Sequence, residues 1–406
     1  MLSDLRVLDL TDERGFLAGK ILADLGADVI KVEPPGGDCA RDRGPFLGDA
    51  SRESSLPWLA LNTSKRGITL ALDSERGREL FLSLVRSCDV VLESFAPGTL
   101  DAWQIGFEVL AKARPGVIVC AITPFGQSGP YADYHGHDLI VVAMGGNAFL
   151  TGDPERPPVR CSMPTSYYHA APTAVLGILT ALHALETNRH EGSGQFVDVS
   201  MRECQLATLM GGPGQFAHSG RLGSRQGERL GLTREIWEAK DGYITFGLRG
   251  GPTRIPNLIA MVEHMQEHDC APDWLVEFDW GRFSPITAGE EELARLEQVF
   301  AAFFRTRSMA ELYETALERR ILLAPCNDAR EILRQKQLRD RELFVTLEYP
   351  ELGASIEHPG FFARSSEFVV GVRGRAPRIG EHNGSVYGEL GMTPAELDTL
   401  AEQGVI

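Results

Sequence analysis

The sequence has no run of the roughly 18 to 20 consecutive apolar residues that cross a bilayer. Its first ten residues carry charges at Asp4, Arg6 and Asp9, where a secretory signal has an unbroken apolar core. We therefore expect a protein of the cytoplasm. Apolar residues make up 43% and charged residues 24% of the chain, which are ordinary proportions for a globular protein and exclude wholesale disorder.

Paired cysteines and an excess of positive charge are also missing. The seven cysteines are odd in number and none is spaced as CxxC, so we expect free, mostly buried thiols without a disulfide framework. Lys and Arg number 40 against 56 Asp and Glu, a net charge of −16. This balance disfavours nucleic acid and anionic membranes as partners, because both are polyanions. An anionic ligand must therefore find a local basic pocket.

The glycine fingerprint of a dinucleotide-binding fold is absent, although the chain opens with a strand-helix-strand pattern. The second strand ends at Glu33, where such a fold places an acid for a ribose hydroxyl. Residues 11–15 contain no GxGxxG, so we expect no NAD. Residues 15–20 resemble a fragment of a phosphate-binding loop, but the spacing differs and Ile21 replaces the Ser or Thr that holds magnesium.

What is present is a regular alternation of strands and helices, which predicts an α/β protein with a parallel sheet and right-handed crossovers. We expect Pro172 in the first turn of its helix, where a proline is tolerated. The predicted strands cover residues 7–10, 28–32, 68–72, 90–92, 117–122 and 195–199, and the predicted helices cover 16–25, 75–86, 100–111, 138–144 and 172–186.

The composition changes after residue 210. Seven glycines lie between residues 211 and 231 and predict a linker or mobile loop at a domain boundary. A strand at 243–246 and amphipathic helices at 293–304 and 309–319 predict a smaller α+β domain beyond it. Near the C-terminus, Thr393 and Glu396 with Pro394 between them form a capping box for a final helix.

Two histidine patterns resemble metal sites. His264 to His268 reads HxxEH, a zinc-enzyme pattern, but its polar neighbours predict a solvated helix face and no companion ligand is identifiable. His135 and His137 form HxH without a third ligand. We therefore expect no metal.

Several stretches together resemble the class III CoA-transferases, the CaiB/BaiF family, over essentially the whole chain. The resemblance implies a Rossmann-like large domain of residues 1–210 and 331–406 and a smaller central α+β domain of residues 211–330. It also implies an interlocked dimer and a coenzyme A ester as substrate. The stretches are residues 7–10 (VLDL), 23–38 (ADLGADVIKVEPPGGD), 65–70 (KRGITL), 125–131 (FGQSGPY), 192–201 (GSGQFVDVSM), and 376–377 through 380–383 (AP and GEHN).

In that family the thioester is attacked by an aspartate that lies about ten residues before the Gly-Ile-Leu of a long helix. Counting back from Gly177 places this position at Tyr167, and residues 156–185 contain no Asp or Glu. A phenol is a poor substitute, because its reference pKa of about 10 keeps it protonated near neutral pH. The resemblance therefore implies that this chain has no catalytic residue of its own at the nucleophile position.

The resemblance also implies contacts with CoA, and several of its positions are altered. Ser94 stands where members that bind CoA carry asparagine, and Asp73 and Ala102 stand where some members carry cations. An acid or an alanine in place of a cation weakens phosphate binding. The implied CoA-contacting residues are Lys65, Arg66, Leu70, Phe95 and Met163.

These departures favour a non-catalytic subunit of a heteromeric class III CoA-transferase that moves CoA between succinyl-CoA and an aryl-succinate-type carboxylic acid. Its partner would be a homologous chain carrying the aspartate, in a heterodimer or heterotetramer, and would bind most of the CoA ester. In an interlocked dimer each chain forms half of the structure, so a chain that has lost its nucleophile is still needed for the fold.

Three alternatives remain. Gly136-His137-Asp138 resembles the α-methylacyl-CoA racemases of the family, in which that histidine works opposite an aspartate whose position is Tyr167 here. The chain could instead be an active homo-oligomeric transferase with an unrecognised nucleophile, or a non-enzymatic CoA-binding protein.

Overall fold

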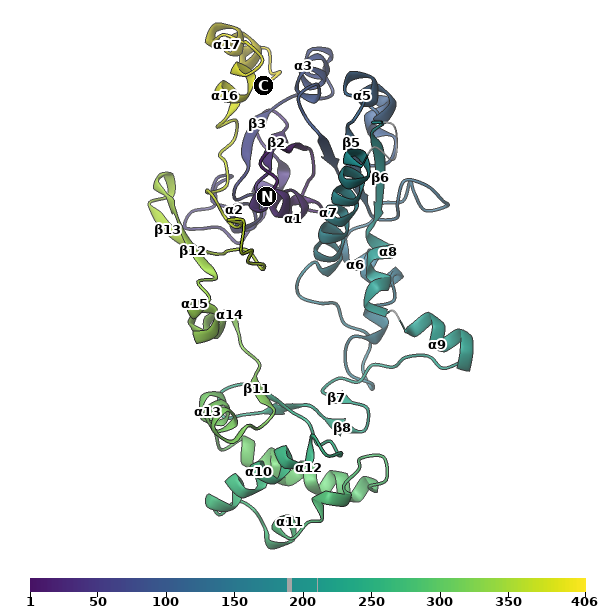
Figure 1. Cartoon of the computed structure of the whole chain (residues 1–406), viewed down its shortest axis with the longest axis vertical. Helices are drawn as coiled ribbons and strands as arrows, with labels where there is room; N and C mark the ends of the chain where they lie inside the picture. Colours follow the sequence, from purple (N-terminus) through teal and green to yellow (C-terminus); the bar gives the residue numbers. More distant parts are fainter. Residues whose placement is uncertain (188–191, 210) are drawn as a thin grey trace. The chain divides into compact units, whose positions relative to one another are not determined.

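The computed structural model describes residues 1–187, 192–209 and 211–406, in two compact units (Figure 1). The first unit contains Met1–Ala148, Arg160–Leu222 and Gln337–Ile406, and the second contains Phe149–Val159 and Gly223–Lys336. The division differs from the sequence-based boundaries of 210 and 330, and residues 149–159, which we placed in the large domain, belong to the second unit. Residues 188–191 and 210 lie outside the described residues, and so does the start of a turn that the glycines and serine of residues 191–194 predict.

The first unit is built on a six-stranded parallel sheet with the strand order β3-β2-β1-β4-β5-β6. The order reverses between β1 and β4. Strand β1 pairs with β2 on one side and with β4 on the other, so Leu8 lies beside Ile30 of β2 and Val91 of β4. The predicted parallel α/β fold is therefore confirmed. The strands are β1 (Arg6–Asp9), β2 (Asp28–Glu33), β3 (Arg66–Thr69), β4 (Val90–Glu93), β5 (Ile118–Thr123) and β6 (Gln195–Ser200).

Helices cover both faces of this sheet, so alternate residues of one strand enter two different cores. Val7 packs in the core that contains α1, α6, α7 and α8, whereas Leu8 packs in the core that contains α3, α5, α16 and α17. Strands buried on both faces read as continuous apolar runs. The helices of the unit are α1 (Phe16–Asp24), α2 (Leu56–Leu61), α3 (Glu75–Val85), α4 (Thr99–Ala102), α5 (Phe107–Ala113), α6 (Asp138–Met144), α7 (Thr165–Glu186), α8 (Met201–Leu206), α9 (Gly212–Ser219), α16 (Asn383–Gly388) and α17 (Pro394–Glu402).

The C-terminal segment covers the outer edge of β3, the first strand in the sheet order. The backbone N–H of Thr69 donates to Asn383 Oδ1 at 2.9 Å, and that of Gly67 donates to His382 Nδ1 at 3.0 Å. The Tyr387 hydroxyl donates to the carbonyl of Thr69 at 2.7 Å. Side chains of the segment thus take the place of a further strand.

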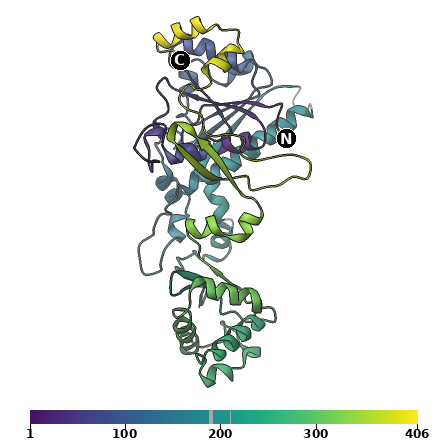
Figure 2. The ribbon, with the colours of Figure 1, turned by 90° about the vertical axis from the view of Figure 1, so that its left-hand side faces the viewer.

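A hairpin of β12 (Phe344–Tyr349) and β13 (Ala354–Pro359) also belongs to the first unit and is visible in yellow-green in Figure 2. Tyr349, which is fully buried, packs in a small core with Phe16 and Trp58. The hairpin is thereby anchored beside α1 and α2.

Helix α7 begins at Thr165, so the prediction of a start at residue 172 is wrong and Pro172 lies inside the helix. The Asp138 carboxylate accepts hydrogen bonds from the backbone N–H and the hydroxyl of Ser166, at 2.9 and 2.7 Å. These bonds satisfy the first turn of the helix. Because the acceptor comes from α6, the local sequence did not show this cap.

Helix α7 is also the one described helix that is long and apolar enough to span a membrane, with a mean hydropathy of 1.2. The sequence had suggested no such segment. Length and composition are weak grounds, because the core helix of a soluble protein passes the same test. Here α7 packs against α1, α8, β5 and β6.

Three further predictions are corrected. The single helix expected at 100–111 is two helices, α4 and α5, separated by a turn in which Gln104 has a φ of 58°. The glycine-rich segment after residue 210 holds the helix α9 and a short hairpin of β7 (Arg229–Leu230) and β8 (Thr233–Arg234). Three of the seven cysteines are buried, fewer than expected, and all seven are free.

The second unit packs helices around a three-stranded antiparallel sheet of order β11-β10-β9. Its core is aromatic: Phe246 lies 5.5 Å from Phe300 and 5.4 Å from Phe304, between ring centroids. Its elements are β9 (Ile236–Glu238), β10 (Tyr243–Phe246), β11 (Leu323–Pro325), α10 (Ile255–Glu267), α11 (Asp273–Val276), α12 (Glu290–Phe304), α13 (Met309–Arg319) and α14 (Ala329–Arg334), with α15 (Lys336–Asp340) at the boundary.

The histidines of the HxxEH pattern lie at the end of α10, and the expectation that both lie on a solvated face is wrong. His264 is only 8% exposed and packs edge-on to Phe303, with ring centroids 5.6 Å apart. Glu267 and His268 are exposed.

Candidate functional site

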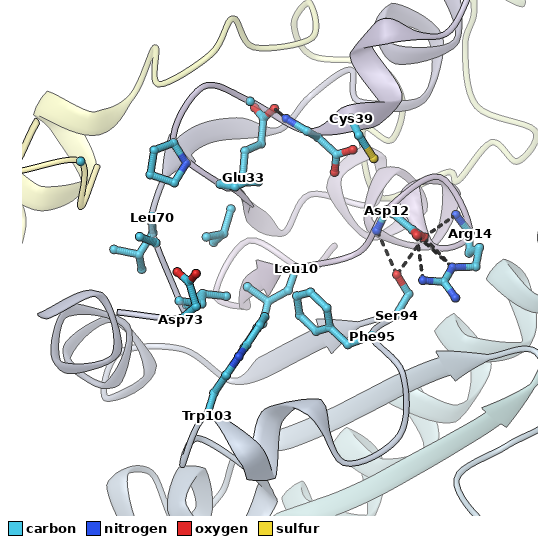
Figure 3. Close-up of a pocket in the computed structure, with 18 of the residues that line it drawn as sticks. Leu10, Asp12, Arg14, Glu33, Cys39, Leu70, Asp73, Ser94, Phe95 and Trp103 are labelled. Atoms are coloured by element: carbon cyan, nitrogen blue, oxygen red, sulfur yellow. Dashed lines mark hydrogen bonds and ion pairs between the residues drawn. The ribbon is translucent and has the colours of Figure 1, made fainter. Parts of the chain in front are cut away.

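A cavity of about 680 Å³ lies where β1, β2, β3 and β4 end (Figure 3). Its walls come from the loops that follow each strand, including Asp12, Asp38, Asp73 and Ser94. The carboxyl ends of strands on either side of the order reversal form the crevice in which open α/β sheets bind ligands. The volume is in the usual range of small-molecule sites.

Asp12 and Ser94 join the two loops at the reversal point. The backbone N–H of Asp12 donates to Ser94 Oγ at 2.9 Å, and the Ser94 hydroxyl donates to Asp12 Oδ1 at 3.0 Å. The Asp12 carboxylate also accepts from Arg14 Nε at 2.8 Å and faces Arg14 Nη2 at 2.8 Å. This guanidinium is therefore neutralised by its own loop.

Glu33 is committed to internal contacts. Its carboxylate accepts two bonds from Arg41, at 2.7 and 2.8 Å, and one from the backbone N–H of Asp38 at 2.8 Å. Arg41 in turn stacks on Trp58, with its guanidinium 3.7 Å from the ring centroid. Glu33 thus shapes the loop after β2, and the acceptor positions that a ribose hydroxyl needs are in use.

One wall of the cavity is aromatic. Phe95 and Trp103 meet edge to face, with ring centroids 5.1 Å apart, and Leu10 lies beside them (Figure 3). Leu70 lines another side of the cavity, directly after β3. The aromatic wall suits a planar ring, because aromatic faces stack with purines.

The polar walls of the cavity are poorly suited to binding phosphate groups. Arg14 and Arg52 are the cations among the described lining residues, and both already face acids; Arg52 Nε lies 2.9 Å from Asp42. Arg52 also donates to the carbonyl of Asp38 at 2.9 Å. Asp73 adds an exposed negative charge to the same cavity. The cavity therefore offers a ring-binding wall with little free positive charge.

The five CoA-contacting residues implied by the sequence are not gathered at this cavity. Leu70 and Phe95 line it. Arg66 is held at the start of β3 by Asp28 and Glu389, with N–O distances of 2.6 to 2.9 Å. Met163 is exposed in the segment before α7, and Ala102 lies next to Trp103 in α4.

Lys65 is fully enclosed on the α1 side of the sheet. Its Nζ donates to Asp9 Oδ2, Asn62 Oδ1 and the carbonyl of Phe16, all at 2.8 to 2.9 Å. Burial lowers the pKa of Lys65 to about 8, against the attraction of Asp9. A Cβ on Gly19 would lie 2.1 Å from Asp9 Oδ2, so the glycine leaves room for this ion pair.

Tyr167 is buried near the start of α7 and is 9% exposed. Its oxygen accepts a 3.4 Å hydrogen bond from the backbone N–H of Asp138. Burial raises the pKa of Tyr167, and the negative charges of Glu13 and Asp12 raise it further. The phenol is thus kept protonated, which suits neither a nucleophile nor a base.

His137, required by the racemase alternative, is the N-cap residue of α6 and makes no side-chain capping bond there. It is exposed, as is His135. A racemase needs a second acid-base group opposite this histidine, and the raised pKa of Tyr167 makes the phenol a weak candidate.

Sequence reasoning passed over Glu93, the last residue of β4. It is 5% exposed, accepts from the backbone N–H of Phe95 at 2.6 Å, and burial raises its pKa to about 7. The sequence feature that could have identified Glu93 is an acidic residue at the end of an apolar strand. Glu93 places a group that titrates near neutral pH behind the Ser94–Phe95 wall.

The family model for CoA-transferase family III matches residues 2–383 of this chain. The chain belongs to this family. Members transfer CoA between carboxylic acids and use acyl-CoA thioesters as substrates. The implied class of reaction is therefore confirmed.

Two characterised relatives match the full length of the chain. It is 33% identical to the succinyl-CoA:(R)-benzylsuccinate CoA-transferase subunit BbsE of Thauera aromatica, over 100% of this chain and 98% of the relative. It is also 33% identical to the succinyl-CoA–D-citramalate CoA-transferase of Chloroflexus aurantiacus, with the same coverage. Both names specify succinyl-CoA.

A solved structure supports the fold. A CaiB/BaiF family protein from Brucella suis superposes with a TM-score of 0.81 at 27% identity, over 95% of this chain and 98% of that protein. The fold of the family therefore extends over nearly the whole chain.

Proposed function

We propose that this chain is the non-catalytic subunit of a heteromeric class III CoA-transferase of the cytoplasm, which moves CoA between succinyl-CoA and an aryl-succinate-type acid. Its partner is a homologous chain that supplies the aspartate nucleophile, and the two chains form an interlocked dimer or a tetramer of such pairs. The substrate class follows the name of the benzylsuccinate relative.

The observation that carries the proposal is the chemistry at Tyr167. An acyl-carrying group must be a good nucleophile and then a good leaving group, as a carboxylate is in an anhydride. Tyr167 has a raised pKa, and its oxygen already accepts the Asp138 N–H. No Asp or Glu lies between residues 156 and 185, and the one acid of α7, Glu186, is its last residue, at the end of the helix far from Tyr167.

The surface of the first unit supports a partner chain. Large apolar side chains are exposed along four successive helices, α6 to α9, of which α6, α7 and α8 contact one another. Apolar groups gathered in this way mark protein interfaces. Two relatives are named as subunits, BbsE and the beta subunit of a succinyl-CoA–L-malate CoA-transferase. The exposed side chains are Leu139, Ile140, Met144, Leu176, Leu206 and Phe216.

The cavity at the strand ends is the proposed place for any CoA that this chain binds, with Leu70 and Phe95 as contacts. Lys65, Arg66 and Met163 lie outside its lining. The shortage of free cations there fits a chain that leaves most of the CoA binding to its partner.

The test is to produce the chain alone and together with a homologous chain that carries aspartate at the Tyr167 position. Native mass and succinyl-CoA-dependent transfer to benzylsuccinate are measured for each sample. We expect activity only from the heteromer, and its loss when the partner's aspartate is replaced by asparagine.

Tyr167→Phe is the decisive variant in this chain, and Tyr168→Phe is its matched control. Both should leave the activity of the heteromer within about twofold. A homo-oligomer of this chain that transfers CoA, or a large loss of activity in Tyr167→Phe alone, overturns the proposal. In the second case His137→Ala then tests the racemase mechanism.

A further inference from the structure

The end of α10 brings together two histidines and a carboxylate on one side of the second unit. One donor atom from each of His264, Glu267 and His268 lies within 4.8 Å of the others. His264 and His268 are one helical turn apart, and their ring centroids are separated by 4.5 Å. A histidine pair at this spacing presents two nitrogens to one point in space.

The His264 ring has a buried nitrogen without a partner in the described chain. Its Nδ1 is enclosed but makes no hydrogen bond, and the nearest Glu267 oxygen is 4.0 Å away. A buried polar atom left unpaired is costly, so its presence indicates a ligand at this position. The ring itself is fixed against Phe303.

The His268 ring is oriented as metal-bound histidines usually are. Its Nδ1 is 2.9 Å from the backbone carbonyl of His264, which leaves Nε2 as the outward-facing nitrogen. In metal sites the second ring nitrogen commonly donates to a backbone carbonyl, and this bond selects the tautomer that coordinates.

Glu267 is also held by the neighbouring helix. The Arg319 side chain of α13 donates to Glu267 Oε2, the oxygen that lies 4.0 Å from His264 Nδ1. A carboxylate has two oxygens with several acceptor positions, so Glu267 can keep this bond to Arg319 and still ligate a metal.

We propose that His264, Glu267 and His268 form a zinc site, with a water molecule as fourth ligand. Zinc bonds of about 2.1 Å place tetrahedral donors about 3.4 Å apart. The exposed Glu267 and His268 side chains need only small rotations to reach this spacing. Two imidazoles and a carboxylate are ligands that zinc prefers among divalent metals available to a protein. The metal would fasten the last turn of α10 to α13 through Glu267 and Arg319.

The test uses the full chain, stripped with a chelator and titrated with Zn²⁺ by equilibrium dialysis and elemental analysis. We expect one zinc per chain. His268→Gln and Glu267→Gln should each weaken binding by about tenfold or more. Both residues are exposed, so these variants are expected to fold, which circular dichroism checks.

Two controls exclude other sites. His218→Gln removes an exposed histidine of α9, and Cys270→Ser removes the thiol next to the cluster; both should leave the affinity unchanged. Co²⁺ in place of zinc should give the visible absorption of a four-coordinate ion without a thiolate charge-transfer band. Failure to bind zinc, binding that survives in both His268→Gln and Glu267→Gln, or binding lost in Cys270→Ser overturns the proposal.

Discussion

Asp12 and Ser94 exchange hydrogen bonds across the point where the strand order of the sheet reverses, at 2.9 and 3.0 Å. The pair joins the loop after β1 to the loop after β4, and both loops line the cavity. Because Asp12 also holds Arg14, one serine hydroxyl supports the position of a carboxylate and a guanidinium.

Ser94→Ala is expected to destabilise the chain by about 1 to 3 kcal/mol, since it leaves the backbone N–H of Asp12 without its acceptor. Ser94→Thr keeps the hydroxyl and is the control. Urea unfolding of the two variants checks the difference. Equal midpoints for alanine and wild type would show that water replaces the hydroxyl at no cost.

Lys65→Met is expected to cost about 3 to 5 kcal/mol, because it leaves the Asp9 carboxylate buried without its cation. Lys112→Met, at an exposed position of α5, should change the free energy of unfolding by less than about 0.5 kcal/mol. Denaturant unfolding and CoA titration are measured on the same samples. A Lys65 variant of normal stability that no longer binds CoA would instead assign Lys65 to the ligand.

Glu93 should make stability fall as the pH rises. Burial raises its pKa from 4.5 to about 7, so between these values the folded chain keeps a proton that the unfolded chain releases. The contribution of Glu93 is complete below pH 4.5 and is lost as the pH rises through 7. A shift of this size corresponds to about 3 kcal/mol.

Glu93→Gln removes this dependence. We expect the variant to gain stability relative to wild type from about pH 5 to pH 8, as judged by urea unfolding at each pH. Glu108→Gln, an exposed residue of α5, is the control. A wild-type minus variant difference that is flat over this range would contradict the raised pKa.

Phe95→Ala tests the cavity as a CoA site in the heteromer. Loss of an aromatic stacking surface costs about 1 to 3 kcal/mol, so the affinity of this subunit for CoA should drop about tenfold. Phe368→Ala removes an exposed ring away from the lining and should have no effect. Calorimetric titration with CoA measures the affinity of each variant. Equal affinities for the two variants would show that CoA does not bind against Phe95.

The sheet and most helices could be predicted because their signals are local. Strands covered on both faces read as apolar runs, so β4 and β5 were located within one or two residues. The capping box at Thr393 is a short-range pattern, and it is confirmed at the start of α17. The helix at 138–144 and the strand at 243–246 also match α6 and β10.

The sequence-based predictions are wrong where contacts between residues far apart in the sequence determine the structure. Helix α7 begins early because Asp138, 28 positions before Ser166, provides its cap. His264 is buried because α12 places Phe303 against it, although its neighbours in sequence are polar. The candidate site was predictable as a region, since its loops follow the predicted strands. Its charge pairs were not, because Arg41 and Glu33 meet only through the fold of the loop between them.

The covered edge of β3 links the last part of the chain to the first. Until the ribosome has added His382, Asn383 and Tyr387, the backbone N–H groups of Gly67 and Thr69 and the carbonyl of Thr69 lack the partners they have in the folded chain. An open strand edge readily pairs with other chains. A nascent or prematurely terminated polypeptide therefore exposes an unpaired edge of β3 while the second unit is synthesised. Protection of this edge from association with other chains is most needed during that interval.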